Sequence, residues 1–365
     1  MKKGILIAYG ELFLKSEGVK RLFLQRLTNN LSFFLGKEKI AFKMDSSRDR
    51  IFIETDSKKT KKVIERVFGI AWFADAYHLN LKELLAFDYH KQIKKGETFA
   101  IRMKKDREVI DKVAKLIDGK VNLDRPKKEL FIEKRGESYF LYFKKTKGAG
   151  GLPAGSAGKV LAMVSGGIDS VPAAYLSAKR GAENIWVHFH SFPLVSNKSI
   201  EKVKELAKVF EKYQKNIKIY LVPFQKIQME VKAKAPANYR VLLYRRLMLQ
   251  IAEKIVERED CGALVTGESL GQVSSQTLAN MKITEEGVKI PVLRPLIGMD
   301  KEEIIEIAQK IGTFDISIKP QEDCCTLFVP KHQTAKGDLE TTKELEKKID
   351  AKSLVEELVG LTLHL

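Results

Sequence analysis

The chain has 365 residues, of which 44% are hydrophobic and 31% are charged, and its formal net charge at pH 7 is +18. This composition excludes a disordered chain, and no apolar run reaches the ~18 residues that a transmembrane helix needs. The three cysteines exclude a disulfide scaffold and favour a reducing, cytoplasmic compartment. At roughly 100–200 residues a domain, the length predicts two or three domains.

Almost all of the excess positive charge lies in the first two-fifths of the chain. Residues 1–147 carry 35 Lys and Arg against 20 Asp and Glu, whereas residues 148–365 carry 30 against 27. A Lys- and Glu-rich surface of the kind found in heat-adapted proteins would show balanced signs throughout. An excess confined to one region instead indicates a polyanionic partner, most often nucleic acid.

The basic region reads as small α+β units. Residues 4–9 are apolar and are followed at once by Glu11, which predicts a strand rather than a secretory signal. Helical spacing over 16–34 and a short strand over 51–53 complete a β-α-β unit up to about residue 55. The later pattern predicts helices over 58–67, 81–93 and 107–117, strands over 98–103, 129–133 and 139–144, and a hairpin turn over 134–137.

The second part begins after an uncharged, glycine-rich stretch over 148–158, which indicates an interdomain linker or an exposed crossing loop. Strands and helices then alternate, which predicts an α/β fold with a doubly wound parallel sheet. A charged segment from about residue 334 has an apolar stripe at helical spacing and predicts a helical tail that packs on the body. The stripe consists of Leu345, Ile349, Leu354, Leu358 and Leu361.

The run Ser165-Gly166-Gly167-Ile168-Asp169-Ser170 follows a predicted strand and opens a predicted helix. Two glycines let the backbone turn tightly and bring its N–H groups close to a ligand. The helix N-terminus and the two serine hydroxyls add further donors, so the run predicts a nest for pyrophosphate. The carboxylate of Asp169 is suited to hold Mg²⁺ on the phosphates.

This run matches the pyrophosphate loop of the ATP-pyrophosphatase (PP-loop) superfamily, whose members adenylate a substrate oxygen and release pyrophosphate. The segments 187–191, 245–248, 266–278 and 324–332 follow in the order expected for one of its branches. Tyr9-Gly10-Glu11 and residues 99–104 extend the match towards the N-terminus. The chain therefore resembles the tRNA 4-thiouridine synthetase (ThiI) family over nearly its full length.

The resemblance implies four parts. Residues 1–55 are expected to form a ferredoxin-like domain, 56–148 a THUMP RNA-binding domain, 149–335 a Rossmann-like PP-loop ATP-pyrophosphatase domain, and 336–365 a helical tail. Many relatives carry a further rhodanese domain, but this chain ends 40 residues after Cys325, so no such domain is expected.

The resemblance also implies the ATP site. Arg245 is a fixed cation that can meet a phosphate bidentately, and Gly267 and Gly271 would let the chain approach a nucleotide. The expected contacts are Met163, Val164, Ser165, Gly166, Gly167, Asp169, Ser170, His188, Phe189, Arg245, Gly267 and Gln276.

The cysteines divide into a polar pair and a single residue. Adjacent cysteines in a polar loop are poorly explained as core residues, and the resemblance implies that Cys324, in preference to Cys325, carries a persulfide. Cys261 precedes a predicted strand and is expected near the same sheet edge, either to resolve a disulfide with Cys324 or as inert packing. An iron–sulfur cluster on Cys261, Cys324 and Cys325 is a minor alternative.

Clustered cations in the first half predict contacts with RNA phosphates, which fix position and make affinity salt-dependent. The resemblance implies that the THUMP region binds the acceptor stem and 3′ end of tRNA. The candidate contacts are Arg102, Lys104, Lys105, Arg107, Lys127 and Lys128.

Together these features predict a tRNA sulfurtransferase that adenylates uridine 8 and replaces its O4 by sulfur. The sulfur would come from a cysteine desulfurase, a separate carrier or sulfide; a homodimer and a further role in thiamine synthesis are family expectations. Two alternatives are another PP-loop enzyme acting on a different tRNA base and a non-catalytic RNA-binding protein. An intact PP-loop argues against the second.

Overall fold

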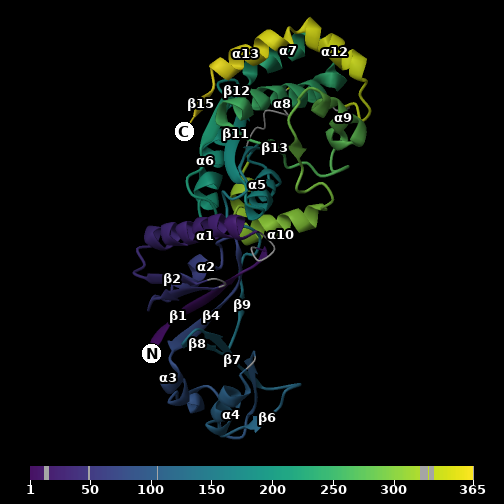
Figure 1. Ribbon diagram of the computed structural model, residues 1–365. Coiled ribbons are helices and arrows are strands. Elements are labelled where there is room, and N and C mark those ends of the chain that lie inside the picture. The colour runs from purple at the N-terminus through teal and green to yellow at the C-terminus, as the bar shows by residue number, and fades with distance from the viewer. Residues whose placement is uncertain (12–15, 48–49, 105, 321–327, 329–332, 365) are drawn as a thin grey trace. The chain divides into compact units, whose positions relative to one another are not determined.

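Figure 1 shows the computed structural model, which describes residues 1–11, 16–47, 50–104, 106–320, 328 and 333–364. Two compact units divide the chain, Met1–Pro153 and Ala154–Leu365. Within the described residues, no helix combines the length and the apolar character needed to cross a membrane.

The first unit starts with a ferredoxin-like arrangement, as expected. Four antiparallel strands lie in the order β2-β3-β1-β4, and α1 and α2 cover one face. Apolar residues alternate along β1: Ile5 and Ile7 pack with the helices, while Leu6 faces the opposite side. The elements are β1 (Lys2–Tyr9), α1 (Glu17–Lys37), β2 (Lys43–Ser47), β3 (Arg50–Glu54), α2 (Thr60–Ile64) and β4 (Ile70–Leu79).

The sheet continues from β4 through β8, β7, β5 and β6, and β9 also pairs with β4. The prediction of a helix over 81–93 is wrong about its length. The helix ends after one turn as α3, and the hydroxyl of buried Tyr89 then donates to the carbonyl of Leu84. The elements are α3 (Leu81–Leu85), β5 (Thr98–Met103), α4 (Arg107–Lys115), β6 (Lys120–Val121), β7 (Lys128–Arg135), β8 (Ser138–Tyr142) and β9 (Thr146–Lys147).

The start of the glycine-rich stretch is packed against the sheet rather than free. The N–H of Gly148 donates to Ala71, and the N–H of Gly150 donates to Ile70. A Cβ at Gly148 would come within 2.3 Å of the Ile70 carbonyl oxygen. Gly148 therefore allows the backbone to pass close to that of β4. Its place in a glycine-rich stretch did not indicate this role.

The second unit has the predicted parallel sheet, in the order β14-β13-β10-β11-β12 with β15 antiparallel at the edge. The chain leaves β10 towards β11 and β12 and then returns to β13 on the other side. The carboxyl ends of β10 and β13 therefore flank the switch point of the sheet, where open α/β folds bind ligands. The strands are β10 (Lys159–Met163), β11 (Glu183–His190), β12 (Ile219–Pro223), β13 (Ala263–Val265), β14 (Val292–Leu293) and β15 (Leu363–His364).

Helices cover both faces of this sheet, with α8 packed against α7, α9 and α13, and α5 packed against α6 and α10 (Figure 1). The C-terminal stripe is buried as predicted from Leu345 to Leu358, but Leu361 is exposed. The helices are α5 (Ser170–Lys179), α6 (Lys198–Phe210), α7 (Gln225–Lys234), α8 (Arg240–Glu259), α9 (Leu278–Glu286), α10 (Lys301–Ile311), α11 (Phe314–Ser317), α12 (Leu339–Lys348) and α13 (Ala351–Gly360).

Candidate active site

The predicted pyrophosphate loop lies between β10 and α5, with Asp169 as the N-cap residue of α5. Gly166 has a φ of +86°, a conformation that side chains with a Cβ rarely adopt. The Ser165 hydroxyl accepts a hydrogen bond from the N–H of Gly167 at 3.2 Å, and the Ser170 hydroxyl donates to the Gly167 carbonyl at 3.4 Å. These contacts shape the turn that presents backbone N–H groups at the helix start.

His188 supports this loop from the neighbouring strand. Its Nδ1 donates to the carbonyl of Val164 at 2.8 Å, so its Nε2 accepts from the hydroxyl of Ser199 at 3.1 Å. Burial lowers the pKa of His188 to about 4, so the ring is neutral at pH 7. Its side chain does not line the cavity described below. His188 therefore acts as a neutral hydrogen-bonding group and does not supply a positive charge to a phosphate.

Asp169 is held by two side chains that the sequence analysis did not single out. Its Oδ1 lies 2.5 Å from Nζ of Lys301 at the start of α10, and its Oδ2 accepts from Gln272 at 2.9 Å. Lys301 thus brings a cation to the helix end where phosphate is expected. In the sequence, Lys301 is a lysine directly after the N-cap residue Asp300, and this pattern does not differ from that of an ordinary helix start.

Gly267 follows β13 and touches the start of α5. A Cβ at this position would lie 2.9 Å from the carbonyl carbon of Asp169 and from the nitrogen of Ser170. The glycine is therefore required by contact between two protein loops, whereas the sequence analysis expected it to admit a nucleotide. Gly271 has a φ of +76° and open space around its Cβ position.

These loops surround a cavity of about 620 Å³ at the switch point. One wall is apolar and includes Phe189, Met248 and Leu249, and another carries the pyrophosphate loop. Gln276 is 8% exposed, and its Oε1 has no partner among the described residues. Of the twelve expected ATP contacts, the cavity is lined by Met163, Val164, Ser165, Gly167, Asp169, Ser170, Phe189, Arg245, Gly267 and Gln276, but not by Gly166 or His188.

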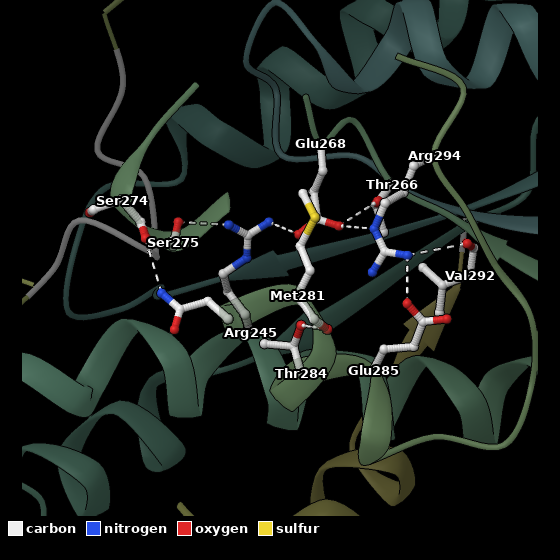
Figure 2. Close-up of polar contacts among 11 residues, drawn as sticks. Arg245, Thr266, Glu268, Ser274, Ser275, Met281, Thr284, Glu285, Val292 and Arg294 are labelled. Atoms are coloured by element: carbon white, nitrogen blue, oxygen red, sulfur yellow. Dashed lines mark hydrogen bonds and ion pairs between the residues drawn. The ribbon is translucent and has the colours of Figure 1, made fainter. Parts of the chain in front are cut away.

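Arg245 reaches the cavity wall with its guanidinium already bound (Figure 2). It donates to the Ser275 hydroxyl at 2.7 Å and forms an ion pair with Glu268, whose other oxygen accepts from Arg294 at 2.7 Å. Burial would raise the pKa of the Glu268 carboxyl, but the two arginines outweigh it and hold that pKa below its usual range. Glu268 has no sequence signal for this role, because a carboxylate beside a phosphate site is unexpected.

Cys261 lies away from this cavity, contrary to expectation. It precedes β13 next to Lys159, at the amino edge of the sheet, whereas the cavity lies at the carboxyl edge. The side chain packs against the core of the unit, and burial raises the pKa of its thiol to about 11. A thiol with this pKa is protonated and a poor nucleophile at pH 7.

Cys324 and Cys325 fall outside the described residues, but one described residue further along the chain reaches the cavity. Gln333 lines it and accepts a hydrogen bond from the Ser274 hydroxyl at 3.3 Å. The Phe328 carbonyl accepts from Arg240, at the start of α8, at 3.2 Å.

In the first unit, the predicted cations border two adjoining hollows. The cationic hollow, of about 650 Å³, is lined by Arg102, Lys127 and Lys128 among others. The aromatic hollow, of about 690 Å³, is lined by Arg102 and Lys104 together with Arg50, Lys134, Arg135, Lys145, Trp72, Phe131 and Tyr142. Arg107 lines neither hollow, and Lys105 lies outside the described residues.

Comparison with known proteins decides the family. The model "Thiamine biosynthesis protein (ThiI)" matches residues 155–351, and the ThiI ferredoxin-like domain matches residues 4–74. A probable tRNA sulfurtransferase of Caldanaerobacter subterraneus is 42% identical over 98% of both chains. The chain belongs to the ThiI family.

Other relatives agree with this assignment. A probable tRNA sulfurtransferase of Bacillus licheniformis is 39% identical over 98% of this chain and 94% of its own. A solved ThiI-like structure, of a 4-thiouridine synthetase–RNA complex with bound ATP, is 30% identical with a TM-score of 0.89 and covers 100% of this chain and 99% of its own. A Pyrococcus horikoshii structure with 22% identity and a TM-score of 0.64 shares the fold over 86% of this chain and 100% of its own.

Gly267→Ala should weaken ATP binding on the order of tenfold or more, because the new methyl group must push β13 and the start of α5 apart. Calorimetric titration with ATP measures this. Gly298→Ala, in open space within the same unit, is the matched control and should bind within about twofold of wild type. Wild-type affinity in Gly267→Ala would refute the close contact.

The unit that contains His188 should lose stability as the pH falls from about 6.5 to 4. In this window the unfolded chain binds a proton at His188 that the folded chain excludes, which amounts to about 3 kcal/mol at the acidic end. Denaturant titrations across this range should show a shallower pH dependence for His188→Gln. Exposed His90→Gln should keep the wild-type slope, and an unchanged slope in His188→Gln would contradict the assignment.

Proposed function

We propose that this protein uses ATP to activate a uridine of tRNA, uridine 8 by family, and replaces its O4 with sulfur to give 4-thiouridine. The observation that carries the proposal is the meeting of the pyrophosphate loop, Arg245 and Gly267 around one cavity at the switch point. The full-length similarity to tRNA sulfurtransferases and to an ATP- and RNA-bound 4-thiouridine synthetase supports it.

The two walls of the cavity suit the two ends of ATP. The apolar wall at Phe189, Met248 and Leu249 fits a purine ring, and the buried, unpaired Oε1 of Gln276 is an acceptor for an exocyclic amine. The N–H groups at the start of α5 fit the phosphates.

In the reaction we propose, the uridine O4 attacks the α-phosphorus as its bond to the β-phosphate oxygen breaks, and pyrophosphate leaves. Arg245, which lines the cavity, and Lys301, which pairs with Asp169 at the start of α5, supply positive charge, and the loop N–H groups are fixed in advance. The protein therefore contributes positioning and charge stabilisation.

Mg²⁺ fits the donor set at this site with Asp169 as its ligand. No group of three or more metal-binding side chains occurs in the part of the chain that the structure describes, which suits Mg²⁺ held by one carboxylate plus phosphates and water. Such an ion would neutralise phosphate charge. Lys301 pairs with the same carboxylate. When Mg²⁺ binds Asp169, the Lys301 ammonium must therefore pair partly or wholly with the phosphates instead.

We retain Cys324 as the carrier of a persulfide. Its terminal sulfur would attack C4 of the adenylated uridine and AMP would leave, which joins the base to Cys324 through an S–S bond. A second thiol must attack the Sγ of Cys324 to release 4-thiouridine and form a disulfide. The position and pKa of Cys261 argue against its being that thiol, so Cys325 or a thiol of the sulfur donor is the better candidate.

An iron–sulfur cluster does not fit Cys261, whose side chain packs into the apolar core at the amino edge. The sulfur donor, a homodimer and a role in thiamine synthesis remain proposals that rest on the family. A PP-loop enzyme acting on another tRNA base is the alternative, and identification of the modified nucleoside separates the two.

The tRNA contact we propose is the pair of hollows in the first unit. Lys104, Lys127 and Lys128 supply cations, while the rings of Phe131 and Tyr142 lie parallel at 5.0 Å. Cations bind phosphates, so the lysines suit the backbone of an RNA, whereas the buried Tyr142 stacks on Phe131 and forms part of the wall of the hollow.

Replacing Lys104, Lys127 and Lys128 together by Ala should weaken tRNA binding and flatten its salt dependence, with the slope of log affinity against log salt falling by about 2–3. Filter binding over a salt series measures this. The control triple Lys58, Lys59 and Lys62 to Ala removes equal charge from exposed positions that line neither hollow. Equal changes in both triples would place the RNA elsewhere.

Unmodified tRNA transcript with ATP, Mg²⁺, a cysteine desulfurase with labelled cysteine as the persulfide donor, and a thiol reductant should yield 4-thiouridine. Cys324→Ser should abolish this product, whereas Cys261→Ser should stay within about twofold of wild type because its thiol is protonated and lies at the other sheet edge. Loss in Cys325→Ser alone would move the persulfide to Cys325, and loss in Cys261→Ser would restore a disulfide or cluster role. Pyrophosphate release without thiouridine would indicate a separate sulfur carrier.

A further inference from the structure

Glu268 is a buried carboxylate shared by two arginines from different elements (Figure 2). Its side chain is 8% exposed, with one oxygen paired to Arg245 of α8 and the other accepting from the Nε of Arg294 and, at 3.1 Å, from the Thr266 hydroxyl. Glu268 and Arg245 both line the cavity, but Arg294 does not. One carboxylate therefore has a cation on the cavity side and a second cation behind it.

Arg294 is fixed in place by the sheet. It directly follows β14, whose pairing with β13 places it beside Thr266, and the N–H of Thr266 donates to the carbonyl of Leu293 at 3.0 Å. Its guanidinium also donates to Glu285 at 2.6 Å and is 12% exposed. Arg294 is thus held by two carboxylates and does not line the cavity.

The charges at this wall explain why a second arginine is needed. Arg245 and Glu268 alone would form a neutral pair, and the repulsion by Glu268 would offset much of the attraction of Arg245 for an anionic ligand. With Arg294 behind the carboxylate, Arg245, Glu268 and Arg294 together carry one net positive charge. Glu285 also pairs with Arg294, but its side chain is 44% exposed, so water screens its charge. Burial makes this balance matter, because charges are screened weakly away from water.

We propose that Arg294 is a positioning residue that neutralises Glu268, so that Glu268 can hold the Arg245 guanidinium in place without cancelling its attraction for the phosphates of ATP. This inference rests on the proposed function, in which the cavity binds ATP. Arg294 would then raise the affinity of the site for anions although Arg294 does not line the cavity.

The test compares ATP with adenosine, which presents the same base and sugar without phosphates. Arg294→Met should raise the Kd of ATP on the order of tenfold but change the Kd of adenosine by less than about twofold. Equal weakening of both ligands would show that Arg294 supports only the packing of the site, and would overturn the proposal.

A second variant separates charge from folding. Glu268→Gln combined with Arg294→Met loses both ion pairs of Glu268 and the pair of Arg294 with Glu285, but of Arg245, Glu268 and Arg294 it again leaves one positive charge, on Arg245. Its ratio of ATP Kd to adenosine Kd should return to within about threefold of wild type, which loss of structure cannot produce. A double variant that binds ATP no better than Arg294→Met, relative to adenosine, would overturn the proposal.

Glu286→Gln is the matched control. Glu286 neighbours Glu285 on α9 but pairs with Arg246 and Lys343, so its loss removes two ion pairs of α9 without touching Arg294. It should leave the ratio unchanged, and a shift equal to that of Arg294→Met would contradict the assignment. If wild type binds adenosine and ATP equally poorly, the proposed ATP site itself fails.

Discussion

The contact between Gly267 and the start of α5 is the constraint on which the site depends. It requires that β13 lie beside β10 in parallel register and that residue 267 have no side chain. Because the two loops then touch at the switch point, the helix N-terminus and the loop after β13 face one cavity. A longer side chain at 267 would separate the phosphate end from the wall that carries Arg245 and Glu268.

Charge in the site is organised by pairs that leave a small positive excess. Asp169 is matched by Lys301, and Glu268 by two arginines, so each buried carboxylate has a cation partner. Buried charges are tolerated only when they are paired and hydrogen-bonded. The pairing keeps each cation in place before a ligand arrives, which is the condition for stabilising charge at a reacting phosphate.

His188 is held in place in the neutral state before a ligand binds. Both of its nitrogens are used to hold the end of β10 against β11 and α6, and its burial removes it from the titration range near pH 7. The loop is therefore braced by a group whose charge does not change under physiological conditions.

The sequence by itself determined the family, the α/β class, the pyrophosphate loop and the basic first half, because each depends on local spacing or on composition. Only the tertiary structure decided that Lys301 and Arg294 belong to the site, that Cys261 lies at the opposite edge, and that Gly148 and Gly267 serve backbone contacts. The physical reason is that these roles arise from strand order and register. Residues more than 100 positions apart in the chain meet because parallel strands bring their ends to one edge.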